Sequence, residues 1–155
     1  MKTITISREF GSGGRELRKR FADGLDQNYV EDKLNYYRWK YFPFSFRGTI
    51  GSATYIQLNK VTHNPFNIFV CADVEAKVKR CMERASESEQ LTKKDIVQKM
   101  KEIDNIRSQT RDILSDTNWG QRDAYHLTIN TSDWNIKDLA PAVAAFASSW
   151  FGRDS

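Results

Sequence analysis

The 155-residue sequence predicts an α/β protein in which a short parallel sheet lies between layers of helices. Short β-branched or apolar runs alternate along the chain with longer segments of helical periodicity. The segment Phe66–Cys71 is almost continuously apolar, as is typical of parallel strands that are buried on both faces. Strands in this order are joined by right-handed helical crossovers, which make the sheet parallel. The length suits one domain over residues 1–155.

The N-terminal segment contains a strand, a glycine-rich turn and a helix, in that order. Thr3–Ser7 is a β-branched run and predicts the strand. Residues 11–14 read Gly-Ser-Gly-Gly and predict the turn. A helix is predicted over Arg15–Leu25, because Leu17, Phe21 and Leu25 recur at i, i+4 and i+8 and so form one apolar face.

A second strand–helix unit follows the middle of the chain. Phe66–Cys71 is the clearest strand, and Asp73 is placed to cap the helix after it. That helix is predicted from Val74 to about Arg84. Its predicted inner face consists of Val74, Val78 and Met82.

A long helix is predicted from Thr92, which resembles a capping box with Asp95, to about Leu114. The residues on it that can be buried are Ile96, Met100, Ile103 and Ile106. A polar face is shared by Lys101, Asp104, Arg107 and Arg111. Such a face is usually solvated, so its spacing alone is weak evidence for a site.

The C-terminal part predicts one more strand and one more helix. Tyr125–Asn130 has strand character, and Ser132 or Asp133 can cap the helix that follows. The predicted core stripe of this helix consists of Ile136, Leu139, Val143, Phe146 and Trp150.

The segment from Asp26 to Pro65 has no clean periodicity. Tyr29-Val30 is a candidate for a second short strand. Seven aromatic residues crowd between positions 36 and 46, and Arg38, Lys40 and Arg47 lie among or beside them. Aromatic side chains interleaved with basic ones are typical of single-stranded nucleic-acid grooves. Packing is the more common role of such a cluster, and the sequence leaves both interpretations open.

Composition limits the possible partners and sites. The formal net charge of +4 favours an anionic partner, which includes nucleotides, nucleic acids and acidic proteins. Two cysteines, Cys71 and Cys81, and two isolated histidines are too few and too dispersed to predict a disulfide or a metal centre. No apolar run approaches the ~20 residues of a membrane span, and no signal peptide precedes the first strand. We therefore expect a cytoplasmic protein without a membrane partner.

The glycine-rich turn is a candidate phosphate-binding loop. A tight turn between a strand and a helix directs backbone N–H groups toward an anion at the positive end of the helix dipole. The usual loop reads G-x-x-x-x-G-K-[ST]. In this chain Arg8 stands at its first glycine, Gly14 at its lysine and Arg15 at its Ser or Thr. On this motif alone, a turn that only joins strand to helix is an equally good interpretation.

The run from Ile4 to Glu16 resembles the N-terminal signature of the cytidylate kinase-like family. Further blocks are similar to that family in the same order along the chain. They are residues 43–48 (PFSFRG), 66–70 (FNIFV), 78–84 (VKRCMER), Asp104 with Arg107, 119–120 (WG) and 129–132 (INTS). Together these blocks are specific, and they reach both ends of the sequence.

The resemblance implies a three-layer P-loop kinase fold and a nucleoside monophosphate kinase. Such an enzyme transfers the γ-phosphate of ATP to CMP or a related pyrimidine monophosphate, with Mg²⁺ held by few protein ligands. It implies an ATP-binding loop formed by Gly11, Ser12, Gly13, Gly14 and Arg15. The implied catalytic cations are Arg15, which takes over part of the missing lysine's charge, and Arg80 and Arg84, which close over the donor as part of a mobile lid. The implied acceptor site consists of Asp104, Arg107 and Arg47.

One departure from the family pattern concerns the middle of the chain. Family members carry a strand ending in Gly-Arg just before the FNIFV block, whereas Thr49–Asn64 contains none, and residues 27–64 are short overall. Either a strand has been lost or internal residues are missing from the sequence, and we expect the second, because losing a central strand should break the core.

Two other functions remain as alternatives. A catalytically degenerate nucleotide-binding regulator is favoured by Gly14 in place of lysine. A basic single-stranded nucleic-acid-binding module is favoured by the net charge and the aromatic cluster, although no helix-turn-helix, zinc-finger or RNP signature supports it. Nucleic acid is therefore the less expected partner, and the oligomeric state is left open.

Overall fold

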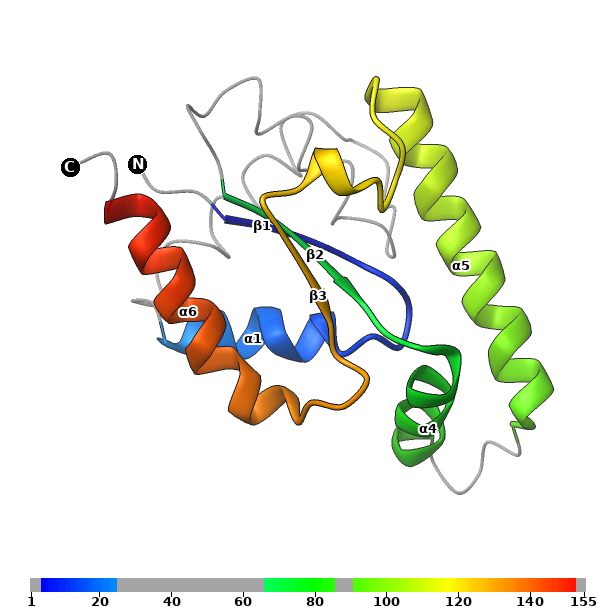
Figure 1. Ribbon diagram of the computed structural model, residues 1–155. Coiled ribbons are helices and arrows are strands. Elements are labelled where there is room, and N and C mark those ends of the chain that lie inside the picture. Colours follow the sequence, from blue (N-terminus) through cyan, green and yellow to red (C-terminus); the bar gives the residue numbers. More distant parts are fainter. Residues whose placement is uncertain (1–3, 25–65, 86–90, 153–155) are drawn as a thin grey trace.

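The computed structural model describes residues 4–24, 66–85 and 91–152 (Figure 1). The candidate strand at Tyr29-Val30, the aromatic cluster and the question of a strand before Phe66 lie outside these residues.

Three parallel strands form the described sheet. They are β1 (Ile4–Arg8), β2 (Phe66–Cys71) and β3 (Leu127–Asn130), and the order across the sheet is β1-β2-β3. Ile6 pairs with Ile68, and Ile68 pairs with Leu127. The sequence prediction of an α/β fold with a short parallel sheet is confirmed.

Four α-helices accompany the sheet in the described residues. They are α1 (Gly14–Gly24), α4 (Val74–Arg84), α5 (Lys93–Leu114) and α6 (Ile136–Gly152). The predicted helices before α6 agree with these bounds within one or two residues. The predicted strand at Tyr125 begins two residues later, at Leu127. Its first residue instead closes a short 3₁₀ helix, η1 (Arg122–Ala124), because the Tyr125 N–H donates to the Arg122 carbonyl.

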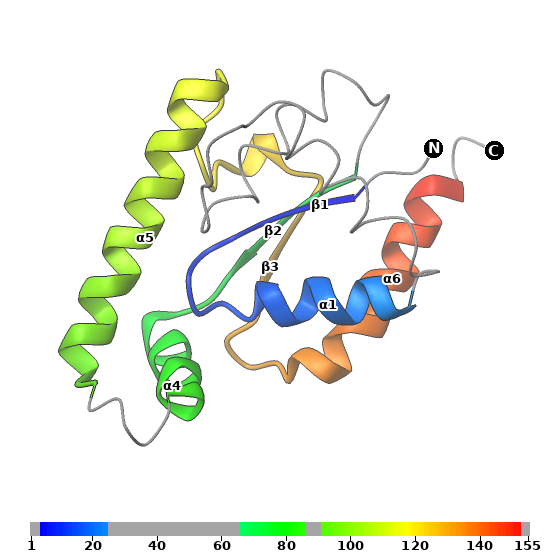
Figure 2. The ribbon, with the colours of Figure 1, turned by 180° about the vertical axis from the view of Figure 1, so that it is seen from behind.

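Helices cover both faces of the sheet. α1 and α6 lie on one side, α5 lies on the other, and α4 lies near the C-terminal ends of the strands (Figures 1 and 2). The main core lies between the sheet and the α1–α6 layer. Its fully buried side chains include Leu17, Phe66, Ile68 and Val70.

α5 turns part of its predicted polar face inward. Ile96 and Met100 are buried as expected, but Ile106 is 48% exposed, whereas Arg107 and Arg111 are 8% and 1% exposed. The expectation of a solvated face is therefore wrong for these arginines. The reason is that both guanidinium groups find oxygen acceptors inside the protein.

α4 also differs from its predicted inner face. Val78 is buried, but Val74 and Met82 are 53% and 43% exposed. The buried neighbour of Val78 is Lys77, whose Nζ lies 2.9 Å from a Glu9 carboxylate oxygen. The inner face of α4 thus includes a cation that pairs with Glu9, just before the glycine-rich turn, which apolar spacing alone could not reveal.

The helix caps follow the predictions in two cases of three. Thr92 and Asp95 form the predicted capping box at α5. Asp73 occupies the N-cap position of α4, although its side chain makes no capping hydrogen bond. α6 is not capped by Ser132 or Asp133, because Asn135 Oδ1 accepts the Lys137 N–H at 3.0 Å.

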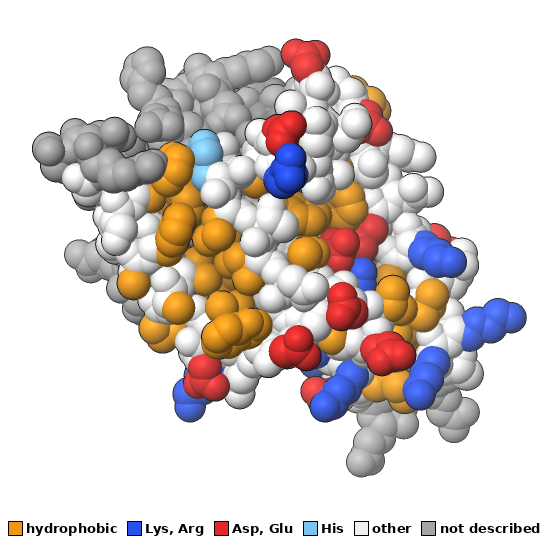
Figure 3. All heavy atoms as spheres, in the orientation of Figure 1, with side chains coloured by type: hydrophobic (Ala, Val, Ile, Leu, Met, Phe, Trp, Pro, Cys, Tyr) orange, Lys and Arg blue, Asp and Glu red, His pale blue; other side chains and the backbone are white. Residues whose placement is uncertain are grey.

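α6 packs against α1 and contributes large and small residues to the main core. Ala140 and Ala147 are buried in the main core together with Ile136, Leu139 and Val143. Phe146, predicted for the core stripe, is 47% exposed, and hydrophobic side chains gather over α6 on the face shown in Figure 3. None of the described helices combines the length and apolar character needed to cross a membrane.

Candidate functional site

The glycine-rich turn joins β1 to α1 and has a backbone that requires glycine. Gly11 and Gly13 both have φ of +80°, a conformation that L side chains rarely adopt. A Cβ atom at Gly13 would lie 2.6 Å from Ile136 Cδ1, so the first turn of α6 closes the space around it. Ser12 is fully buried between them, and its hydroxyl donates to the Glu9 carbonyl at 2.8 Å.

The turn presents a set of backbone donors that no described group satisfies. Among the residues that the structure describes, no acceptor is bonded to the N–H groups of Gly11, Gly13, Gly14, Arg15 and Glu16. Four of these groups belong to the N-terminal end of α1, where the helix dipole favours negative charge. The turn is thus suited to hold an anion such as phosphate.

α5 holds one side of the turn. Asp104 Oδ1 accepts the Phe10 N–H at 2.8 Å and a hydrogen bond from Arg107 at 2.9 Å. Arg107 also donates to the Arg8 carbonyl at 3.0 Å. Burial raises the pKa of Asp104, although the Phe10 N–H and the charge of Arg107 act in the opposite direction. The predicted pair Asp104 and Arg107 is therefore in direct contact with the predicted turn.

α4 holds the turn from another side. The Glu9 carboxylate accepts from Lys77 Nζ at 2.9 Å and from the Ala72 N–H at 3.2 Å. Lys77 is only 8% exposed, so this ion pair is largely shielded from water. Sequence analysis missed Lys77, because one cation among several on a helix gives no sign of which one is buried.

Thr131 closes the turn from the loop after β3. Its hydroxyl donates to the Ser12 carbonyl at 2.6 Å and accepts a hydrogen bond from Arg80 at 3.0 Å. The Arg80 guanidinium also donates to the carbonyls of Thr131 and Trp134. Arg80 is thus bonded to residues 131–134, and it is not among the residues that line the pocket described below.

We expect Thr131→Val to lower the free energy of unfolding by about 1–3 kcal/mol, because it leaves the Ser12 carbonyl and an Arg80 N–H without their partner. Thr128→Val removes a hydroxyl from the exposed side of β3, three residues earlier, and should change stability by less than about 0.5 kcal/mol. Urea denaturation of both variants measures the difference, and equal effects would contradict the assigned contact.

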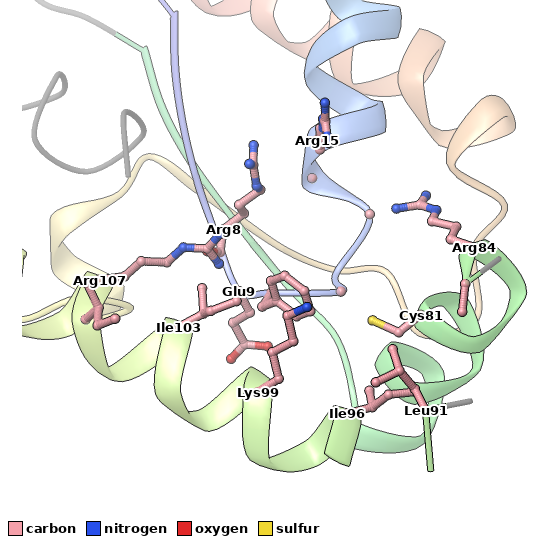
Figure 4. A pocket seen from close by; sticks show the side chains of 16 residues that line it. Arg8, Glu9, Arg15, Cys81, Arg84, Leu91, Ile96, Lys99, Ile103 and Arg107 are labelled. Atoms are coloured by element: carbon pink, nitrogen blue, oxygen red, sulfur yellow. The ribbon is translucent and has the colours of Figure 1, made fainter. Parts of the chain in front are cut away.

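An open pocket of about 630 Å³ lies beside the turn, between α4 and α5 (Figure 4). Cationic side chains dominate its charge. They are Arg8, Arg15, Arg84, Lys99 and Arg107, and Glu9 is the one acidic residue among the described residues that line it. Apolar side chains, among them Ile96, Ile103 and Ile106, form part of its wall. The predicted residues Arg15, Arg84 and Arg107 are thus brought together around the glycines.

Arg8 lines the pocket, although sequence analysis did not select it as a site residue. Its side chain is half-buried, and no carboxylate in the described part of the chain pairs with it. Burial, with the positive charges of Arg107, Arg18 and Arg15, lowers its pKa to about 10. The departure from the usual loop at this position was the signal that could have identified it.

Two predicted residues remain to be placed. Arg84 lies at the end of α4, where it pairs with Glu16 of α1 at 3.0 Å. Arg47 lies outside the described residues.

A family model described as the cytidylate kinase-like family matches residues 51–133, more than half of the chain. The chain belongs to the cytidylate kinase-like family. The match includes β2, α4, α5 and β3 but not the glycine-rich turn, so the turn's geometry is an independent observation. Membership indicates a kinase-like protein and agrees with the family resemblance found in the sequence.

A crystal structure of an uncharacterized protein from Eubacterium ventriosum ATCC 27560 is similar to this cytidylate kinase-like protein, with a TM-score of 0.71 and 22% sequence identity. The alignment covers 96% of this chain and 99% of that chain. At this identity the likeness concerns the fold alone. No curated protein matches the sequence significantly.

Proposed function

We propose that this protein is a nucleoside monophosphate kinase with a P-loop kinase fold, which transfers the γ-phosphate of ATP to CMP or a related pyrimidine monophosphate. The observation that carries the proposal is the set of free N–H groups of Gly11, Gly13, Gly14, Arg15 and Glu16, which lies beside a cationic pocket. A polyphosphate fits these donors, because its oxygens accept several hydrogen bonds and its charge matches the surrounding arginines.

The donor triphosphate would lie on the turn formed by residues 11–15. Backbone amides there would bind the β-phosphate, while Arg15 and Arg84 would neutralise charge on the transferred group. Arg80 would act indirectly, because its guanidinium is bonded to Thr131 and Trp134 and fixes the loop that supports the turn. Movement of Arg80 and Arg84 as a lid remains a prediction.

The acceptor would lie on the α5 side of the same pocket. Arg107 would contact its phosphate, and Asp104 would hold Arg107 in position through the 2.9 Å ion pair. Because Asp104 accepts the Phe10 N–H and Arg107 donates to the Arg8 carbonyl, the proposed acceptor residues are hydrogen-bonded to the segment just before the donor-binding turn. Such proximity is what in-line phosphoryl transfer requires. Arg47 and the choice of pyrimidine base come from the family resemblance alone.

Mg²⁺ would enter with the nucleotide and neutralise charge on the phosphates. In the described part of the chain, no three His, Cys, Asp or Glu residues are grouped closely enough to hold a metal by themselves. Glu9, the acidic residue in the pocket, is already paired with Lys77. The residues thus fit a metal ion that is coordinated mainly by phosphate oxygens and water rather than by protein side chains.

An activity assay with each of the four ribonucleoside monophosphates tests the proposal. We expect ADP formation from ATP with CMP, dependent on Mg²⁺ and well above the rate with the purine monophosphates. ATP binding without turnover would instead favour the degenerate regulator, which the glycine at position 14 also favours. Neither binding nor turnover, together with salt-sensitive binding of single-stranded RNA, would favour the nucleic-acid-binding module.

A further inference from the structure

Two departures from the usual phosphate loop are in contact with each other. Position 14 carries glycine where the pattern has lysine, and position 8 carries arginine where the pattern has its first glycine. A Cβ atom at Gly14 would lie 2.8 Å from Arg8 Cβ and 2.9 Å from Arg8 Cδ. The side chain of Arg8 therefore occupies the space into which any longer side chain at position 14 would extend.

The guanidinium of Arg8 lies close to other cationic side chains. Figure 4 shows it beside the first turn of α1, on the same side as Arg15, and Arg107 approaches from α5. All three residues line the pocket. A half-buried cation among other cations, without a carboxylate partner in the described residues, is unfavourable until an anion binds.

We propose that Arg8 is a phosphate-binding residue that supplies, from the end of β1, the positive charge that a lysine at the start of the helix supplies in the usual loop. Position 14 is then glycine because the aliphatic part of the Arg8 side chain occupies the space of a Cβ atom there, which Val70 Cβ at 3.3 Å limits further. The differences at positions 8 and 14 are then one coupled exchange, in which the cation has moved from position 14 to position 8, rather than two separate losses of function. This inference rests on the proposed function, and it removes the main argument for a degenerate protein.

The first test replaces the charge. Arg8→Gln should weaken binding of ATP and of inorganic tripolyphosphate by about 10- to 100-fold, because it removes a charge-assisted hydrogen bond to phosphate. Arg18→Gln is the matched control, since Arg18 is a nearby cation on α1 that does not line the pocket. It should weaken binding by less than about threefold through the loss of diffuse charge.

A second readout separates phosphate binding from a structural role. Without a ligand, Arg8→Gln should unfold at the same temperature as wild type or at a higher one, because it relieves repulsion from Arg107, Arg18 and Arg15. With tripolyphosphate, the variant should lose most of the rise in unfolding temperature that wild type shows. A lower unfolding temperature without ligand would overturn the inference in favour of a structural role.

A third test restores the residues of the usual loop at positions 8 and 14. Gly14→Lys alone should fold poorly or bind phosphate weakly, because its Cβ collides with the Arg8 side chain. The double variant Arg8→Gly/Gly14→Lys removes that collision and should bind tripolyphosphate at least tenfold more tightly than Arg8→Gly alone. Arg8→Ala/Gly14→Lys is the control, because the Cβ retained at position 8 still blocks position 14.

The outcomes distinguish this inference from the proposed function. If wild type binds neither ATP nor tripolyphosphate, both are overturned. If wild type binds and Arg8→Gln binds equally well, only the role of Arg8 is overturned. If the folded Arg8→Gly/Gly14→Lys variant binds tripolyphosphate no more tightly than Arg8→Gly does, the proposed exchange between positions 8 and 14 is overturned.

Discussion

Asp104→Ala should lower the free energy of unfolding by about 3–5 kcal/mol, since it leaves a buried charge without its ion-pair partner. Arg107 is 8% exposed, and its guanidinium would lose the carboxylate 2.9 Å away. The Phe10 N–H would lose its acceptor as well. Burial raises the pKa of Asp104, so the cost arises from the groups left without a partner rather than from an unusually favourable ion pair. Urea denaturation measures the loss.

Two further variants divide this effect into its parts. Asp104→Asn retains an oxygen for the Phe10 N–H and should cost less than Asp104→Ala. Asp112→Ala removes an exposed carboxylate from the same helix and should change stability by less than about 0.5 kcal/mol. A loss below about 1 kcal/mol for Asp104→Ala would mean that α5 does not hold the turn through this residue.

Gly13→Ala should cost about 2–5 kcal/mol and abolish phosphate binding. Its φ of +80° imposes about 1–2 kcal/mol on any residue with a Cβ atom. Overpacking against Ile136, at 2.6 Å, adds about 1–3 kcal/mol unless the turn shifts. Any such shift moves the free N–H groups on either side of it, so anion binding should be lost even if the protein folds.

Gly152→Ala provides the comparison for Gly13→Ala. A Cβ atom there meets nothing within 4 Å, at the last residue of α6. The same change of residue should therefore leave stability unchanged or raise it by up to about 1 kcal/mol. Thermal unfolding with and without tripolyphosphate tests both variants. Retained phosphate binding by Gly13→Ala would contradict the role given to the turn.

The sequence predicted what short-range patterns determine. Thr92 and Asp95 are three residues apart, so their capping box is visible in the sequence and present in the structure. The glycine-rich turn and the strand Phe66–Cys71 are equally local signals. Each depends on contacts within one turn of chain or on a nearly continuous apolar run, and sequence analysis is reliable for such features.

The contacts that shape the site join residues far apart in the sequence, so local patterns could not predict them. The arginine at position 107 looked solvated because its second acceptor, the Arg8 carbonyl, is 99 residues earlier. Lys77 looked like any surface cation because Glu9 is 68 residues away. Arg8 was recognised only as a departure from a pattern, and its meaning depends on Gly14 lying against its side chain. The family resemblance located Asp104 and Arg107, which charge spacing alone did not.

The hydrogen bond from Thr131 to the Ser12 carbonyl joins residues that are 119 positions apart, so it can form only late in biosynthesis. A ribosome-bound chain that has not yet reached Thr131 contains β1 and its glycines but lacks this partner. β1 itself must wait for β2, with which it pairs across about 60 residues. Such long-range pairing forms slowly. On the proposed function, nucleotide would therefore stabilise the turn only after the residues that follow β3 have joined it.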